Sequence, residues 1–176
     1  ISWEWNRRVK LNAGLSADDN WHKDLILFGS TIMAAALTEE FALFLQLGDG
    51  DMLIVKENGE TELIFEPDED MYGAITHSLC QPNNAINANV RCVLLDKPSL
   101  FLLSTDGLRD CLAGDEEAYE KLVIWMDGRL RKEGWHNVVE ELPEWLSEVS
   151  RRGNGDDTTL GMVQWTMEKD DDTVES

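Results

Sequence analysis

The chain has 176 residues, 43% of them hydrophobic, which is the composition of a globular domain rather than of a disordered chain. Its 35 Asp and Glu residues against 15 Lys and Arg residues give a formal net charge of −20 at pH 7, which excludes a surface suited to nucleic acid phosphates. No apolar run approaches the ~18 residues that a membrane helix needs, so the sequence predicts neither a nucleic acid nor a membrane as a partner.

The first predicted elements are a helix and a strand. Apolar residues at helical spacing predict a short amphipathic helix that ends near Gly14; these residues are Ile1, Trp5 and Val9. Residues 24–38 are apolar and are interrupted by Gly29, Ser30 and Thr31. This pattern predicts a strand with a bulge or a close backbone approach.

A strand and a hairpin follow. Residues 39–51 predict a second strand that ends in an acidic glycine turn. Residues 51–65 predict two strands joined at Asn58-Gly59, because this dipeptide adopts the positive backbone angles of a tight hairpin turn.

The middle of the chain is less regular. Residues 68–89 contain Pro, Asn and Gly without a sustained period, and we interpret them as an irregular, flap-like segment. Residues 90–95 and 100–105 predict another antiparallel pair around the turn at 96–98.

Two helices and a final strand complete the order. Asp115 is a predicted helix cap, and the apolar face of the helix after it consists of Ala118, Leu122, Met126 and Leu130. A second helix has Val138, Leu142, Trp145 and Val149 on one face, and Pro143 is expected to kink or restart it. Residues 158–167 predict a strand, so the order favours an α+β fold over a parallel βαβ fold.

The cysteines and histidines suggest no site of their own. The cysteines are odd in number, lie in apolar surroundings and form no metal-binding cluster, which predicts reduced thiols and a cytoplasmic setting; they are Cys80, Cys92 and Cys111. The histidines lie far in sequence from the acidic segments described next, and we interpret them as surface or packing residues; they are His22, His77 and His136.

Three aspartates occupy equivalent positions at strand ends, beside glycine or a second acid. Asp49 and Asp106 follow predicted strands, and Asp156 precedes one. Any one of them is more often an ordinary turn residue than a ligand. Carboxylates gathered at one rim would repel each other, and oxygen ligands of this kind select Mg²⁺, Mn²⁺ or Ca²⁺. A calcium loop over residues 49–60 is excluded because Ile54 occupies the position that requires glycine.

Four segments, in this order, resemble the motifs of the protein phosphatase 2C type (PPM) of metal-dependent phosphatases. "FGSTIMAAAL" resembles the glycine-threonine strand of that family, and "LGDGD" resembles its Gly-Asp-Ser-Arg turn, with Asp51 in place of arginine. "LLSTDGL" is similar to its Ser-Asp-Gly motif, with Thr105 in place of serine. "GDDTTLGMV" is similar to its Asp-Asn-x-Thr motif, with Asp157 where asparagine is usual.

The resemblance implies a fold, a metal site and an activity. The fold would be a sandwich of antiparallel sheets flanked by helices, as a carboxy-terminal portion of the domain over residues 1–167 with an acidic tail at 168–176. Asp106 and Asp156 would be the catalytic residues and hold the first metal, and Asp49 with Asp106 would lie near a third, weaker one. Two or three Mg²⁺ or Mn²⁺ ions would activate a water for hydrolysis of phosphoserine and phosphothreonine in proteins, such as the targets of a cognate kinase.

The sequence departs from this family at its beginning. It contains no early Glu-Asp segment and no Asp-Gly-x-Gly-Gly stretch, and Arg7 and Arg8 match nothing in the family. The missing amino-terminal segment is expected to be supplied elsewhere, and residues 1–176 alone are expected to have little activity. The substitutions at Asp51 and Asp157 leave a second hypothesis open, a catalytically inactive binding or regulatory module.

Overall fold

The computed structural model describes residues 2–15, 23–66, 77–81, 87–112, 115–153 and 155–166. In these residues two antiparallel sheets form, a three-stranded sheet in the order β1-β2-β5 and a four-stranded sheet in the order β4-β3-β6-β7. The strands are β1 (Ile32–Leu37), β2 (Phe41–Leu47), β3 (Asp51–Lys56), β4 (Thr61–Leu63), β5 (Asn89–Leu94), β6 (Pro98–Ser104) and β7 (Leu160–Gln164). The helices are α1 (Ser2–Asn12), α2 (Asp106–Asp110), α3 (Glu116–Glu133) and α4 (Trp135–Arg152), with a 3-10 helix, η1 (Lys23–Phe28).

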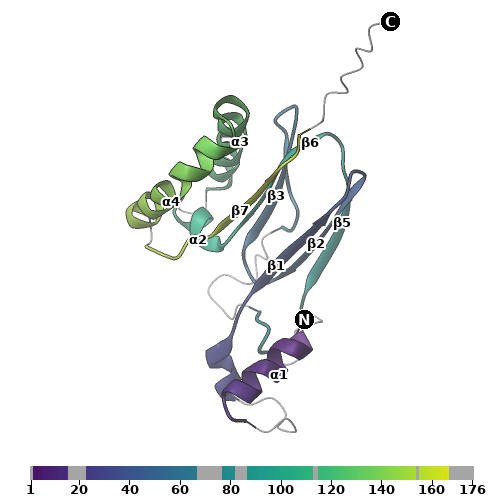
Figure 1. Cartoon of the computed structure of the whole chain (residues 1–176), viewed down its shortest axis with the longest axis vertical. Coiled ribbons are helices and arrows are strands. Elements are labelled where there is room, and N and C mark those ends of the chain that lie inside the picture. Colours follow the sequence, from purple (N-terminus) through teal and green to yellow (C-terminus); the bar gives the residue numbers. More distant parts are fainter. Residues whose placement is uncertain are drawn as a thin grey trace, which may run out of the picture.

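The two sheets stack on each other, with helices on one outer side. Figure 1 shows α3 and α4 beside the four-stranded sheet, and α1 beyond one end of the three-stranded sheet. The predicted α+β sandwich of antiparallel sheets flanked by helices is therefore confirmed. No helix in the described part of the chain combines the length and the apolar character needed to cross a membrane.

The core of the molecule has two parts, which meet at the four-stranded sheet. Between the sheets, Phe44 of β2 packs with Phe101 of β6, their ring centroids 6.4 Å apart. On the other face of the four-stranded sheet, Leu100 and Leu102 pack with residues of α3 and α4 such as Val123. Strands β3 and β6 are consequently buried on both faces and form the rigid centre of the fold.

The outer face of the three-stranded sheet is apolar and is largely exposed among the described residues. Side chains that are partners in the strand register share a face, and Leu43 of β2 lies between Ala36 of β1 and Cys92 of β5. The large side chains exposed on this face include Phe41, Leu43, Val90 and Leu94, the last with 83% of its surface exposed. A continuous apolar sheet face normally packs against another layer.

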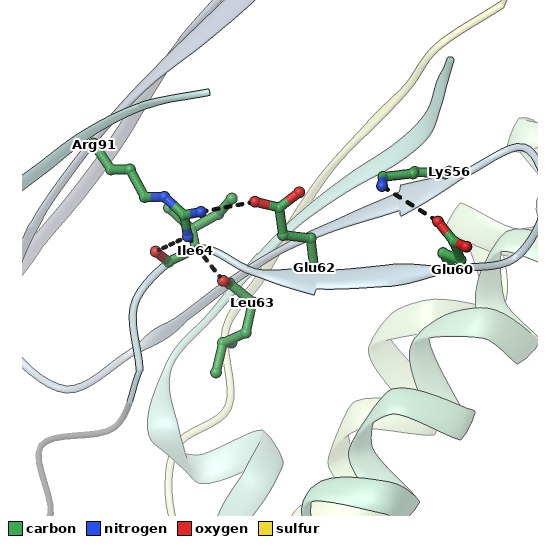
Figure 2. Close-up of polar contacts among 6 residues, drawn as sticks. All are labelled: Lys56, Glu60, Glu62, Leu63, Ile64 and Arg91. Carbon is green, nitrogen blue, oxygen red and sulfur yellow. Dashed lines mark hydrogen bonds and ion pairs between the residues drawn. The ribbon is translucent and has the colours of Figure 1, made fainter. Parts of the chain in front are cut away.

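One arginine links the edges of the two sheets, as Figure 2 shows. The Arg91 guanidinium of β5 donates to the carbonyls of Leu63 and Ile64, at 3.2 and 2.8 Å, and to the Glu62 carboxylate at 2.9 Å. The neighbouring ion pair between Lys56 and Glu60, at 3.3 Å, lies within a single hairpin and links no sheets.

Several sequence predictions are confirmed in detail. The opening helix ends before Gly14, which has φ +69°. Strands β3 and β4 pair around Asn58-Gly59, with Gly59 at φ +86°. The Asp115 carboxylate accepts the Ala118 N–H at 3.1 Å and so caps α3 as predicted.

The prediction of a single strand over residues 24–38 is wrong in its first half. Residues 23–28 form η1, and the strand begins only at Ile32. Leu25 is buried with Val9 of α1 and Cys80 in a small cluster, so this residue packs against α1 instead of extending a strand.

The predicted pairing of residues 90–95 with residues 100–105 is also wrong. Strand β5 pairs with β2, whereas β6 pairs with β3 and β7, so the chain crosses from one sheet to the other between them. The crossing uses Lys97, which has a positive φ of 47°. The apolar runs at both positions resembled a hairpin because both strands face the shared core between the sheets.

Pro143 does not restart the last helix, because α4 continues through it. The missing proline N–H costs one helical hydrogen bond, and the apolar face formed by Val138, Leu142 and Trp145 keeps α4 against the core. The predicted flap over residues 68–89 lies largely outside the described residues, and so does the tail at 168–176.

Candidate metal centre

The Asp49 turn follows β2 and depends on two glycines. Gly48 has φ +123°, and a Cβ there would lie 2.4 Å from Cγ2 of Thr31, which belongs to the first motif. A Cβ on Gly50 would lie 2.7 Å from the carbonyl oxygen of Ser104, at the end of β6. The turn is thus in close contact with both neighbouring motif segments, and it holds Asp49 at an exposed position.

Asp106 begins α2 directly after β6. Its Oδ1 accepts the N–H of Gly107 at 2.9 Å, and the side chain is partly buried. A Cβ on Gly107 would lie 2.6 Å from the carbonyl oxygen of Asp157. Glycine is therefore required here by the close approach of the fourth motif segment to the start of α2.

Hydrogen bonds join the Asp156 segment to Thr105, the residue directly before α2. The Thr105 hydroxyl donates to the Asp157 carbonyl at 3.2 Å and accepts the N–H of Thr159 at 2.9 Å. The Asp156 carboxylate accepts the N–H of Asp157 at 2.8 Å and is exposed. The contact with Thr105 is thus made by the backbone carbonyl of Asp157, at the position where the resembled motif has asparagine.

The carboxylates influence one another electrostatically. Burial raises the pKa of Asp106, and the negative charge of Asp49 raises it further, followed by the charges of Asp110 and Asp156; only the Gly107 N–H opposes this. All three predicted ligands therefore contribute to one local field. A cation placed among them would relieve this repulsion.

Asp51, which stands in place of the arginine of the resembled turn, does not lie beside Asp49 at the exposed surface. It is buried, with 4% of its surface exposed, and its Oδ1 accepts a hydrogen bond from Nη1 of Arg109 at 2.9 Å. Burial raises the pKa of Asp51 to about 6; the Arg109 charge lowers it and the charge of Asp106 raises it. Sequence reasoning missed Arg109, although it is the only basic residue in residues 99–112 and follows Asp106 by nearly one helical turn.

The other candidate groups lie outside this arrangement. His77 makes hydrogen-bond contacts with Gln81 and Asn87, and His136 is exposed beside Glu140 on α4, in agreement with packing and surface roles. His22 lies outside the described residues. Arg7 and Arg8 both pair with Glu4 of α1 and take no part in the site.

The described residues do not form a complete metal cage. Among them, no three His, Cys, Asp or Glu side chains are grouped closely enough to hold an ion. The all-oxygen donors and their mutual repulsion fit the chemistry of a hard divalent cation, but the ligand set needs further groups. The assignment of Asp49, Asp106 and Asp156 as metal ligands stays a prediction.

Two stacked antiparallel sheets flanked by helices, with the motif turns in contact with one another, are the fold of protein phosphatases of the 2C type. The chain belongs to the protein phosphatase 2C family, whose model matches residues 2–147. No curated protein matches the chain in sequence.

Solved structures of bacterial phosphatases share this fold. A bacterial serine phosphatase has a TM-score of 0.63 at 14% identity, over 96% of this chain and 66% of that one. The serine/threonine phosphatase Stp1 from Staphylococcus aureus has a TM-score of 0.61 at 13% identity, over 94% and 63%. The catalytic domain of the serine/threonine phosphatase PstP, in complex with two manganese ions, has a TM-score of 0.54 at 15% identity, over 92% and 64%. The chain thus spans just under two thirds of the length of these structures.

Proposed function

We propose that the chain forms the carboxy-terminal part of a serine/threonine phosphoprotein phosphatase that depends on Mg²⁺ or Mn²⁺. In this proposal Asp106 and Asp156 are catalytic and hold the first metal, and Asp49 with Asp106 holds a further, weaker ion. The observation that carries it is the series of contacts that joins the four motif segments in order, through Gly48, Gly50, Thr105 and Gly107, in the fold of a phosphatase family.

The residues of this chain would contribute carboxylate oxygens in a fixed arrangement. Two divalent ions, when bound, would supply Lewis acidity and a water of lowered pKa for in-line hydrolysis of the phosphate ester. The hydrogen bonds of Thr105 join the Asp156 segment to the start of α2, which supports a fixed spacing between the two proposed catalytic carboxylates. No protein nucleophile is required by this chemistry.

The substrates would be phosphoserine and phosphothreonine in proteins, including the targets of a cognate kinase, in the cytoplasm. The likeness to structures named as serine and serine/threonine phosphatases supports this substrate class. The strong negative charge of the chain, −20, disfavours a nucleic acid or an anionic membrane as a partner.

The remaining ligands would come from an amino-terminal segment outside residues 1–176. Three observations support this: the chain covers 66% of a matched phosphatase structure, it lacks an Asp-Gly-x-Gly-Gly motif, and the outer face of its three-stranded sheet is apolar. We propose that the segment that carries these ligands packs on this face, at Leu43, Val90 and Leu94. Leu43→Glu and Leu94→Glu in the full-length gene product would then lower the free energy of unfolding. Alanine at either position would lower it less.

The direct test of the function is release of phosphate from a phosphoserine peptide by the full-length gene product, with Mn²⁺ and with a chelator. We expect release only with the metal, and loss of release in Asp106→Asn. Asp96→Asn removes the same charge from an exposed turn between β5 and β6 and serves as the matched control. An unchanged rate in Asp106→Asn would refute the proposed role of this residue.

A second candidate function is a non-catalytic binding or regulatory module. It is favoured by the absence, among the described residues, of a preformed group of three ligands. In such a module Mn²⁺ would not raise the melting temperature, and Asp106→Ala would stabilise the fold by removing a repelled charge. A metal-dependent rise in melting temperature favours the phosphatase.

A further inference from the structure

The buried ion pair between Asp51 and Arg109 lies between two of the motif segments. Asp51 begins β3, two residues after Asp49, and Arg109 lies on α2, three residues after Asp106. Oδ1 of Asp51 and Nη1 of Arg109 are 2.9 Å apart, with side-chain exposures of 4% and 20%. The pair is thus a direct side-chain link between the Asp49 turn and the helix that begins at Asp106.

The surroundings fix the Asp51 end of this pair. Asp51 is in register with Ser104, the last residue of β6, whose hydroxyl makes a 2.7 Å hydrogen bond with the buried hydroxyl of Tyr119 from α3. Asp51 is therefore anchored at the start of the central strand pair, β3 and β6. Its second oxygen, Oδ2, is buried without a hydrogen-bond partner among the described residues.

Stability alone does not account for such a pair. Removing two charges from water costs several kcal/mol per ion, and apolar side chains of similar volume commonly replace a buried pair without loss of stability. An oxygen left unpaired adds to this cost. A buried ion pair does, however, fix the distance and the orientation between the two elements that carry it.

We propose that Asp51 and Arg109 are positioning residues, which set the separation between Asp49 and Asp106 by joining the β2–β3 turn to α2. This inference rests on the proposed function, because the separation matters only if these two carboxylates share an ion. The resembled motif has arginine at the position of Asp51. This chain has an acid there instead, and its arginine partner lies on α2. Neither residue touches the reacting groups in this proposal.

The test compares the full-length gene product with a double variant, Asp51→Leu/Arg109→Met. The double variant keeps the net charge, so a change in metal affinity cannot arise from one missing charge. Two quantities are measured: the Mn²⁺ concentration at the midpoint of the metal-induced rise in melting temperature, and amide hydrogen exchange of residues 48–51 and 106–110 without metal. We expect a metal midpoint at least about 10-fold higher, as for other residues that orient ligands, and faster exchange in both segments.

Two further variants separate positioning from a general effect on the core. Asp51→Glu/Arg109→Lys keeps an ion pair of similar overall length, and we expect it to restore most of the wild-type metal midpoint. Asp127→Leu/Arg131→Met removes another pair with a buried carboxylate, at 2.9 Å on α3, and we expect it to change stability without moving the midpoint.

The outcomes are distinct. A double variant that folds, binds Mn²⁺ at the wild-type midpoint and exchanges its amides at wild-type rates overturns the positioning role. If the wild-type protein shows no metal-induced rise, the proposed function fails, and the exchange rates then decide the link itself. Faster exchange confined to residues 48–51 and 106–110 would support the link, and unchanged exchange would overturn it.

Discussion

Thr105 and Asp157 are joined by a hydrogen bond of 3.2 Å, from the threonine hydroxyl to the aspartate carbonyl. The two residues are far apart in the chain, and each lies next to a predicted metal ligand, Asp106 and Asp156. The same hydroxyl accepts the N–H of Thr159 at 2.9 Å, so one side chain satisfies two backbone groups of the returning segment. This contact places the last motif beside the third.

Replacement of Thr105 tests that contact. Thr105→Val keeps the shape and removes both hydrogen bonds, so we expect a loss of about 1–2 kcal/mol in the free energy of unfolding. Thr105→Ser, which has the residue of the resembled motif, keeps the hydroxyl and should be close to wild type. Urea unfolding of both variants measures the difference, and equal stability of the two would show that the hydroxyl contributes nothing.

Gly107 tests the close approach of the same two segments. A Cβ at this position would lie 2.6 Å from the Asp157 carbonyl oxygen, so Gly107→Ala must push the backbone of one segment away, at a cost of about 1–3 kcal/mol. Gly128 is the matched control, because it lies within α3 with nothing within 4 Å of an added Cβ. Gly128→Ala should raise the free energy of unfolding by about 1 kcal/mol.

Arg91 tests the link between the sheets that Figure 2 shows. Arg91→Met removes hydrogen bonds to two carbonyls and a carboxylate, and we expect a loss of about 1 kcal/mol because the side chain is partly exposed. Lys56→Met breaks an ion pair inside one hairpin and should change the free energy of unfolding by about 0.5 kcal/mol or less. Equal effects of the two substitutions in thermal unfolding would argue against the link.

Asp51 should make stability depend on pH when no metal is bound. Burial raises its pKa from 3.8 to about 6, so the folded state binds a proton that the unfolded state releases between these values. The stabilising contribution is complete below pH 3.8 and is lost as the pH rises through about 6; its full size is about 3 kcal/mol. Asp51→Asn does not titrate.

The stability of wild type minus that of Asp51→Asn, measured by urea unfolding in a chelator, should therefore fall between pH 4 and pH 7, the range set by the raised pKa of Asp51. A difference that stays constant over this range would contradict the burial of an ionisable carboxyl at this position.

The sequence was sufficient for features that depend on local chemistry. The hairpin at Asn58-Gly59, the cap at Asp115 and the α+β class follow from turn preferences, capping and periodicity, and all are observed. The order of the acidic motifs likewise indicated the family that the comparison shows.

Features that depend on tertiary context were not predictable. The apolar run before Gly29 forms η1, in which Leu25 packs against Val9. Periodicity along the sequence does not reveal this contact. The pairing partner of β5 is decided by stacking of the sheets, not by the short turn that precedes β6. The partner of Asp51 is Arg109, 58 residues away, and only the fold brings them together.

The central claim is that Asp49, Asp106 and Asp156 form one divalent-metal centre in which Asp106 is common to both ions, and Mn²⁺-dependent melting of the full-length gene product tests it most directly. At free Mn²⁺ about 100-fold above its dissociation constant, the metal should stabilise the wild type by about 2.7 kcal/mol. Without metal, Asp106→Asn should melt higher than wild type, because burial and the Asp49 charge raise the pKa of Asp106 and so disfavour its charged form. With Mn²⁺ this variant should gain nothing, whereas Asp96→Asn should respond like wild type. A wild-type protein that does not respond to Mn²⁺, or an Asp106→Asn variant that responds equally, would contradict the claim.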